Sequence, residues 1–176
     1  FAHAHKSGKS FAVICTDSQP TKESRWAIQD LSDWGIETTF VLDSAMAMIM
    51  PEADWCLTGA DSIGITGSVA NKIGTYQLAL LAQKHAKPLY IATEIMKFQT
   101  DTIEGHPILL EHRPPNEILD NISEFEGSDL VKVVHQFFDL TPADCVRGLI
   151  TEQGIISPET IGTSWNKFVS MFDSVS

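Results

Sequence analysis

The segment from residue 59 to residue 72 carries the side chains best suited to proton transfer and anion binding. Asp61 follows the apolar run 55–58, so its carboxyl group can exchange protons with a ligand there, more readily if partial burial raises its pKa. Three glycines let the backbone approach a ligand closely: Gly59, Gly64 and Gly67. The segment therefore predicts a ligand pocket with Asp61 as its acid–base group.

Two polar residues, Asn71 and Lys72, are expected at the start of a helix over residues 71–85, with Asn71 as its N-cap. Free N–H groups and the helix dipole attract an anion at such a site, and the lysine ammonium adds a positive charge. These features predict a phosphate held near Asp61. The same residues also fit a simpler interpretation, in which Asp61 caps a turn, Asn71 caps the helix and Lys72 is solvated.

Other reactive side chains give weaker signals. Cys15 and Cys56 lie in apolar runs, where a thiol behaves as a small buried group of raised pKa, and Cys145 follows on a segment expected to be helical. None of the three is expected to be a nucleophile. His3 and His5 have no further Cys or His cluster to complete a ligand set. No metal site and no cofactor are expected.

Strands and helices alternate along the first half of the chain. Short apolar runs predict strands, and amphipathic segments between them predict helices. Strands joined through helices form right-handed parallel units with helices on both faces. The expected fold class is α/β, with a Rossmann-like parallel sheet. The strands are expected at residues 11–15, 38–42, 55–58 and 88–92, and the helices at 21–34, 44–50 and 71–85.

The second half has weaker patterns. Residues 100–127 predict a surface excursion rich in Pro and acidic residues, and residues 129–134 a returning strand. A Thr-Pro pair predicts a helix over residues 141–150, with Thr as N-cap and Pro at the first helical position. Two carboxylates in this half, Asp139 and Glu152, fit a cap or a turn as well as a functional role.

Composition narrows the classes of partner. The chain has 176 residues, 43% hydrophobic, which fits one domain with a packed core. A net charge of −11 disfavours direct nucleic-acid binding and anionic membrane surfaces, and the apolar runs are too short to span a bilayer. Three unclustered cysteines and the lack of a leader-like start indicate a cytoplasmic location.

Three separated motifs resemble the family that contains the α, β and δ subunits of translation initiation factor 2B, methylthioribose-1-phosphate isomerase and ribose-1,5-bisphosphate isomerase. They are GADSIGITGSVANKIGTYQLALLA (59–82), FDLTPAD (138–144) and LITEQGIISP (149–158). The resemblance spans nearly the whole chain and covers the family's C-terminal Rossmann-like domain, residues 1–176. It implies that the family's helical N-terminal domain is absent from this chain.

The resemblance implies that Asp61 transfers protons as an aldose 1-phosphate becomes a ketose 1-phosphate, and that Asn71 and Lys72 contact the substrate. It also implies a second acid–base group, a cysteine from an upstream segment that this chain does not contain. Gln19 stands in the substrate loop where the isomerases usually carry Arg, and so looks more like the initiation factor α subunit. Retention of Asp61 favours the isomerases.

The favoured function is therefore a sugar-phosphate isomerase-like domain, incomplete for catalysis by itself. Alternatives are an initiation factor 2B regulatory subunit and a non-catalytic sensor of a sugar or nucleotide phosphate. The resemblance implies association with identical or related subunits. An apolar cluster fits either such an interface or the core: Met46, Met48, Ile49 and Met50.

Overall fold

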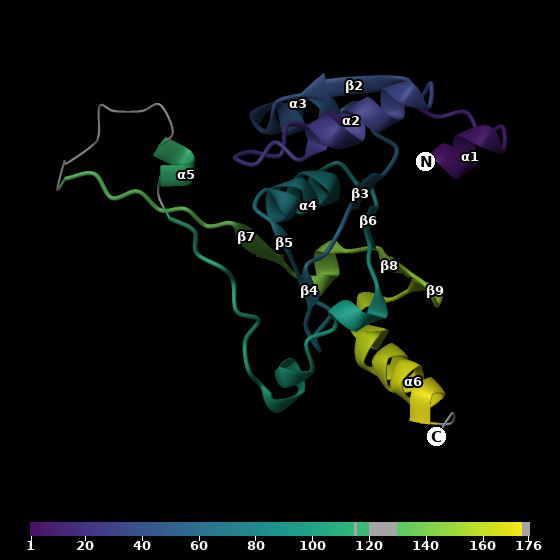
Figure 1. Ribbon diagram of the computed structural model, residues 1–176, viewed down its shortest axis with the longest axis vertical. Coiled ribbons are helices and arrows are strands. Elements are labelled where there is room, and N and C mark those ends of the chain that lie inside the picture. Colours follow the sequence, from purple (N-terminus) through teal and green to yellow (C-terminus); the bar gives the residue numbers. More distant parts are fainter. Residues whose placement is uncertain (115, 120–129, 174–176) are drawn as a thin grey trace. The chain divides into compact units, whose positions relative to one another are not determined.

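The computed structural model describes residues 1–114, 116–119 and 130–173 (Figure 1). The chain forms two compact units, Phe1–Ala53 and Asp54–Ser176. Each has apolar side chains buried in its own interior. Among the described residues, no helix has both the length and the apolar character that crossing a membrane would require.

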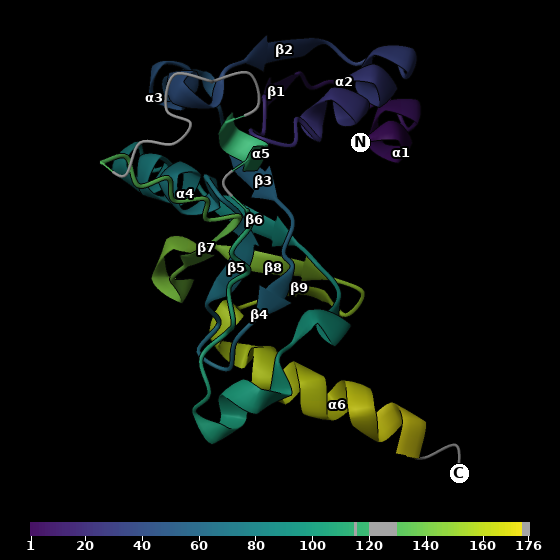
Figure 2. The same ribbon diagram turned by 60° about the vertical axis from the view of Figure 1, so that its left-hand side comes forward.

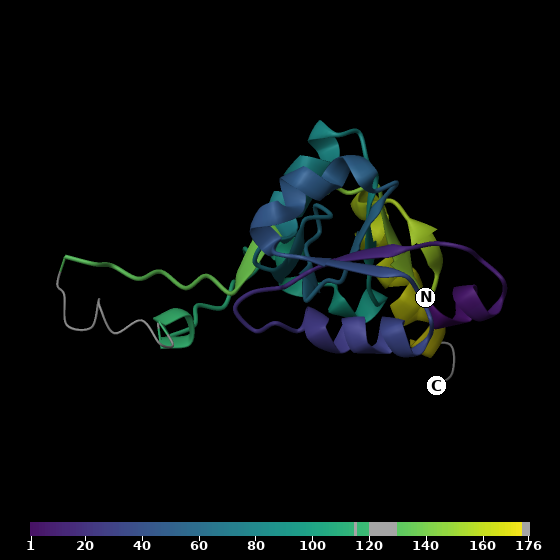
Figure 3. The same ribbon diagram turned by 90° about the horizontal axis from the view of Figure 1, so that it is seen from above.

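The first unit is a parallel strand pair with a helix alongside it. Strands β1 (Val13–Thr16) and β2 (Thr38–Val41) are hydrogen-bonded in parallel. The connection between them contains α2 (Ser24–Asp33), which runs along the pair in Figure 3. Its core includes Leu31 of α2 and Ile36 just before β2. This is one βαβ unit, as the alternating pattern predicts.

The rest of the first unit consists of short helices. Helix α1 (Ala2–Lys6) opens the chain, and α3 (Met46–Ile49) lies between two 3₁₀ turns after β2. Met46 and Met50 are buried, whereas the side chain of Met48 is 71% exposed. The apolar cluster of this segment therefore divides between core and surface, because a helical turn presents successive residues to different sides.

A four-stranded sheet forms the centre of the second unit. Strands β3 (Cys56–Thr58), β6 (Leu89–Ala92) and β8 (Gly148–Thr151) are parallel neighbours, and β9 (Gly154–Ile156) adds an antiparallel edge. Helix α4 (Thr75–Lys84) belongs to the connection from β3 to β6. Leu89 and Ile91 of β6 and Leu149 of β8 are almost completely buried, whereas Tyr90 and Ile150 are partly exposed and Ala92 is exposed.

A second, antiparallel sheet combines two strands from the β3-to-β6 connection with a strand from the second half of the chain. It has the order β4 (Ser62–Ile63), β5 (Val69–Lys72), β7 (Phe138–Thr141). The pairing of β5 with β7 joins segments almost 70 residues apart, with Asn71 opposite Asp139. This sheet was not predicted, because its pairing depends on contacts distant in sequence.

The remaining helices lie in the second half of the chain. Helix α5 (Asn116–Leu119) is short, and α6 (Ile161–Asp173) is the long C-terminal helix seen most clearly in Figure 2. The ring of Trp165 lies 5.7 Å from that of Phe98, which fixes α6 against the 3₁₀ turn that follows β6. Aromatic contact of this kind anchors one face of the helix.

Local signals predicted the four strands of the first half correctly, and the α/β class with parallel strands is confirmed. The helix expected over 71–85 begins only at Thr75, because Asn71 and Lys72 belong to β5. The helix expected over 141–150 is wrong: Thr141 ends β7, a 3₁₀ turn follows, and β8 begins at Gly148.

The strand expected over 129–134 is also misplaced. Residues 130–134 form no strand, and residue 129 lies outside the described residues. The returning strand is β7 instead, which ends seven residues later than expected and pairs with β5 over Phe138–Thr141. Pairing with β5 decides the position of this strand.

Candidate functional site

Asp61 lies just beyond the carboxyl end of β3, where ligands bind in open α/β sheets. Its side chain is exposed, and its backbone N–H donates to the carbonyl oxygen of Ala70 at 2.9 Å. This hydrogen bond places the Asp61 backbone beside the residue that precedes Asn71 in β5. The ammonium of Lys97 donates to the carbonyl oxygen of Ala60, which ties the same turn to the segment after β6.

Gly59 and Asn71 are neighbours in space. A Cβ atom at Gly59 would lie 4.0 Å from Asn71 Oδ1 and 4.0 Å from the carbonyl oxygen of Ala92. The structure therefore brings together Gly59, Asp61 and Asn71, which come from the end of β3 and from β5. A carboxylate and an amide beside a glycine can exchange a proton with a polar ligand and orient it.

The side chain of Asn71 is held by Thr75. Asn71 Nδ2 donates to Thr75 Oγ1 at 2.9 Å, and Thr75 Oγ1 donates to the carbonyl oxygen of Lys72 at 2.8 Å. Thr75 is the first residue of α4 and is 5% exposed. One hydroxyl group thus fixes both the amide of Asn71 and the backbone that follows it.

The ammonium of Lys72 has a different environment. Lys72 Nζ lies 3.7 Å from the centroid of the Phe137 ring, and the guanidinium carbon of Arg113 lies 3.6 Å from the same centroid. Arg113 also pairs with Glu111 at 3.1 Å. Cations within about 6 Å of a ring centroid are attracted by its π electrons. Phe137 therefore restrains Lys72, which sequence reasoning treated as a free cation.

The N-terminus of α4 already has a carboxylate partner. Gly74, not Asn71, is its N-cap residue, with φ +101°, and it offers no side chain. Asp139 Oδ2 instead accepts the backbone N–H groups of Gly74 at 2.8 Å and Tyr76 at 3.0 Å. The phosphate position expected at this helix end is occupied by a carboxylate of the protein itself, since both use the same N–H groups.

Asp139 and Glu152 both act as caps, one of the two alternatives the sequence left open. The carboxylate of Glu152 accepts the N–H of Ile95 at 3.1 and 3.2 Å, at the start of a 3₁₀ turn. Burial raises the pKa of Asp139 above its ordinary value of 3.8, against the lowering effect of the N–H groups of Tyr76 and Gly74. Burial dominates because a charged carboxylate loses solvation there.

Gln19 lies in the other unit, in the loop after β1. Its backbone N–H donates to Asp43 Oδ2 at 2.8 Å, and the N–H of Ser18 donates to Asp43 Oδ1 at 2.9 Å. The side-chain amide of Gln19 donates to Asp17, which is 2% exposed. The loops after β1 and β2 thus meet at the carboxyl edge of their strand pair, as expected for parallel strands.

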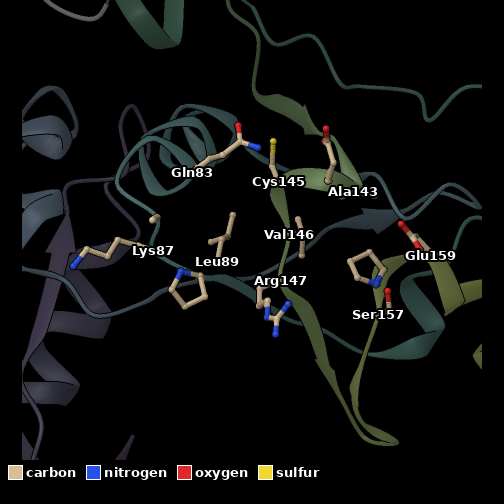
Figure 4. Close-up of a pocket in the computed structure, with 13 residues that line it drawn as sticks. Gln83, Lys87, Leu89, Ala143, Cys145, Val146, Arg147, Ser157 and Glu159 are labelled. Atoms are coloured by element: carbon tan, nitrogen blue, oxygen red, sulfur yellow. The ribbon is translucent and has the colours of Figure 1, made fainter.

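A cavity of about 470 Å³ opens at the opposite, amino ends of β6 and β8 (Figure 4). Its walls include Leu89, Val146 and Arg147, with the thiol of Cys145 and the amide of Gln83 at one side. None of the predicted site residues lines it. Its lining comes from segments far apart in sequence, so no local motif signals it.

The described part of the chain brings no three His, Cys, Asp or Glu side chains together in a way that could hold a metal ion. Cys15, Cys56 and Cys145 form no disulfide with one another. Burial raises the pKa values of Cys15 and Cys56, and burial followed by the charge of Asp144 raises that of Cys145. A thiol of raised pKa is a poor nucleophile at neutral pH.

Comparison with known proteins gives the chain a family. Residues 1–158 match the model of the initiation factor 2 subunit family. Ribose 1,5-bisphosphate isomerase of Methanocaldococcus jannaschii is 36% identical over 156 residues, which cover 89% of this chain and 50% of that protein.

Two solved structures have the same fold, both from Pyrococcus horikoshii. One is 5-methylthioribose 1-phosphate isomerase, with TM-score 0.79, 27% identity, and coverage of 94% of this chain and 48% of that one. The other is translation initiation factor eIF-2B, with TM-score 0.73, 34% identity, and coverage of 89% and 53%. The chain spans about half the length of the relatives it matches. It belongs to the initiation factor 2 subunit family.

Proposed function

We propose that the protein containing this chain is an aldose–ketose isomerase of sugar phosphates, of the ribose 1,5-bisphosphate or methylthioribose 1-phosphate class. The observation that carries the proposal is the exposed carboxylate of Asp61 beside Gly59 and Asn71 at the carboxyl end of β3. Both substrate classes are named for relatives that match this chain. Asp61 is the acid–base group in this proposal.

The isomerisation transfers the hydrogen of carbon two to carbon one and turns the carbon-two hydroxyl group into a carbonyl group, while the bond between carbon one and the ring oxygen breaks. A phosphorylated anomeric centre also needs a proton at the ring oxygen before the ring opens. Asp61 supplies one of these transfers. The second group belongs to a part of the protein outside this chain, where the family resemblance implies a cysteine. The two units together form the C-terminal Rossmann-like domain in this proposal.

Asn71, Lys72, Gly59 and Gln19 are the proposed substrate-binding residues. The substrate phosphate does not bind at the start of α4, because Asp139 uses the N–H groups there. The proposed phosphate contact is Lys72, whose ammonium lies 3.7 Å from the centroid of the Phe137 ring. A restrained cation loses less entropy on binding a phosphate than a freely rotating one.

A regulatory subunit of the initiation factor 2B type is the second candidate, and Gln19 favours it. The amide of Gln19 is engaged with Asp17 and cannot replace the bidentate cation that an Arg would offer a phosphate. The match to the eIF-2B structure from Pyrococcus horikoshii points the same way. A sensor that binds a sugar or nucleotide phosphate without turnover would use the same binding residues.

Phosphorus NMR of the intact protein, incubated separately with ribose 1,5-bisphosphate and methylthioribose 1-phosphate, tests the proposal. A ketose phosphate signal from one of them, absent with the isosteric Asp61→Asn variant, supports the isomerase and names its substrate. No conversion of either by the intact protein overturns it and favours the subunit or the sensor. The proposal includes association with identical or related subunits and a cytoplasmic location.

A further inference from the structure

Asp139 lies opposite Asn71 across the antiparallel pair of β5 and β7. Side chains of directly opposed residues in such a pair have Cβ atoms roughly 5 Å apart on the same face of the sheet. Asp139 Oδ2 accepts hydrogen bonds from Gly74 and Tyr76, the residues on either side of Thr75. The carboxylate therefore fixes the turn in which Thr75 stands.

Thr75 connects this turn to Asn71. Its hydroxyl accepts the amide N–H of Asn71 and donates to the carbonyl oxygen of Lys72. A hydroxyl has one proton, so donation to Lys72 orients its lone pairs toward the Asn71 amide. The position of Thr75 consequently decides how the Asn71 side chain is held, and the position of Thr75 depends on Asp139.

The structural cap alone does not require a buried carboxylate. A Ser, Thr, Asn or Asp at the N-cap position commonly caps a helix through its own side chain. Gly74 has no side chain, so Asp139, 65 positions later in the chain, caps α4 instead. Asp139 Oδ1 is buried and has no hydrogen-bond partner among the described residues. A carboxylate with one unpaired buried oxygen is a costly way to cap a helix, which is the pattern of a functional constraint.

From these contacts we infer that Asp139 is a positioning residue: it holds the turn at residues 74–76 so that Thr75 orients the amide of Asn71 toward the ligand at Gly59. The inference rests on the proposed function for its catalytic consequence. It assigns no contact with the substrate to Asp139 itself. The contact chain it describes runs from Asp139 through the turn to Thr75 and then to Asn71.

The first readout is kinetic and uses the intact protein with the sugar phosphate that it converts. Replacing Asp139 by Ala should raise KM by about 3- to 10-fold, the effect of one hydrogen bond, with a smaller change in kcat. Asp139→Asn keeps an acceptor oxygen and should restore most of the affinity. In an Asn71→Ala background, Asp139→Ala should raise KM no further, because its effect passes through Asn71. If Asp139→Ala raises KM by the same factor in the Asn71→Ala background as in the parent protein, the inference is overturned.

The second readout needs no turnover. Hydrogen exchange of the Asn71 side-chain amide, assigned by its loss in Asn71→Ala, should become about tenfold faster in Asp139→Ala, while Asp139→Asn stays near the original rate. Unchanged exchange in Asp139→Ala would overturn the inference whatever the activity. Faster exchange in a protein that converts neither sugar phosphate would support the positioning role and reject the isomerase. If Asp139→Ala does not fold, Asp139→Ser takes its place, because its shorter side chain also removes the carboxylate and should give the same faster exchange.

Discussion

Replacing Gly67 by Ala should destabilise the turn that joins β4 to β5 more than the same change at other glycines. Gly67 has φ +80°, and an added Cβ would lie 2.6 Å from the backbone carbonyl carbon and oxygen of Pro158. The turn is closed by hydrogen bonds from Gly67 to Gly64 and from Gly64 to Ser68, both 2.9 Å. It therefore cannot shift without disturbing the pairing of both strands.

Two costs add at this position. An L residue in the left-handed region costs about 1–2 kcal/mol, and forcing an extra carbon into a packed backbone contact costs about 1–3 kcal/mol more. Gly105 and Gly154 are matched controls, because they have φ +87° and +97° and an added Cβ would meet nothing within 4 Å. Their Ala variants should show the conformational cost alone, about 1–2 kcal/mol.

Urea unfolding of the three Ala variants and the parent protein measures the difference. We expect Gly67→Ala to lower the free energy of unfolding by about 2–5 kcal/mol, at least 1 kcal/mol more than either control. Equal losses for the three variants would refute the steric argument and show that the φ angle alone sets the cost. If Gly67→Ala also changes the slope of the free energy of unfolding against urea concentration, the β4–β5 region is partly unfolded in the variant instead.

Four other predictions concern the site and the ionisable groups. Asp61→Asn should abolish conversion of the sugar phosphate, measured by phosphorus NMR, and leave its binding affinity within a few-fold of the parent. Full turnover by this variant would exclude an acid–base role for Asp61. Lys72→Ala should weaken binding of the sugar phosphate about tenfold. Burial raises the folded-state pKa of Asp139 above 3.8, so this group favours the folded state most below pH 3.8 and less as the pH rises through the raised pKa. The free energy of unfolding of Asp139→Asn, relative to the parent, should therefore increase from pH 4 to pH 7 in urea titrations, and a constant difference would contradict the shift. Because burial raises the pKa values of Cys15 and Cys56 above 9.0, iodoacetamide at pH 8 should modify them more slowly in the folded protein than in urea, as mass spectrometry of timed samples can show.

Local sequence was sufficient to predict the strands that consist of short apolar runs. The runs at 11–15, 38–42 and 88–92 correspond to β1, β2 and β6 within one residue at most boundaries, apart from a later start of β1. Short runs of β-branched and apolar residues favour strands whichever neighbours they acquire, so local composition was enough to predict them. The position of Asp61 after β3 followed from the same reasoning.

Residues 69–72 and 138–141 show where local reasoning failed. Asn71 resembles a helix N-cap, and Thr141-Pro142 resembles another, yet each segment is a strand because it pairs with the other across almost 70 residues. Hydrogen bonds and burial along the paired strands outweigh the small preference of a single cap residue. Because of this pairing, α4 begins only at Thr75, and the carboxylate of Asp139 caps its N-terminus.

The amino-acid sequence by itself determined the α/β class, the family motifs and the identity of the acidic and amide residues at the candidate site. Only the tertiary structure decided which of them meet: Asn71 with Gly59 and Thr75, and Lys72 with Phe137. The reason is that a side chain's type is local, whereas its partners depend on strand register between segments far apart in the chain.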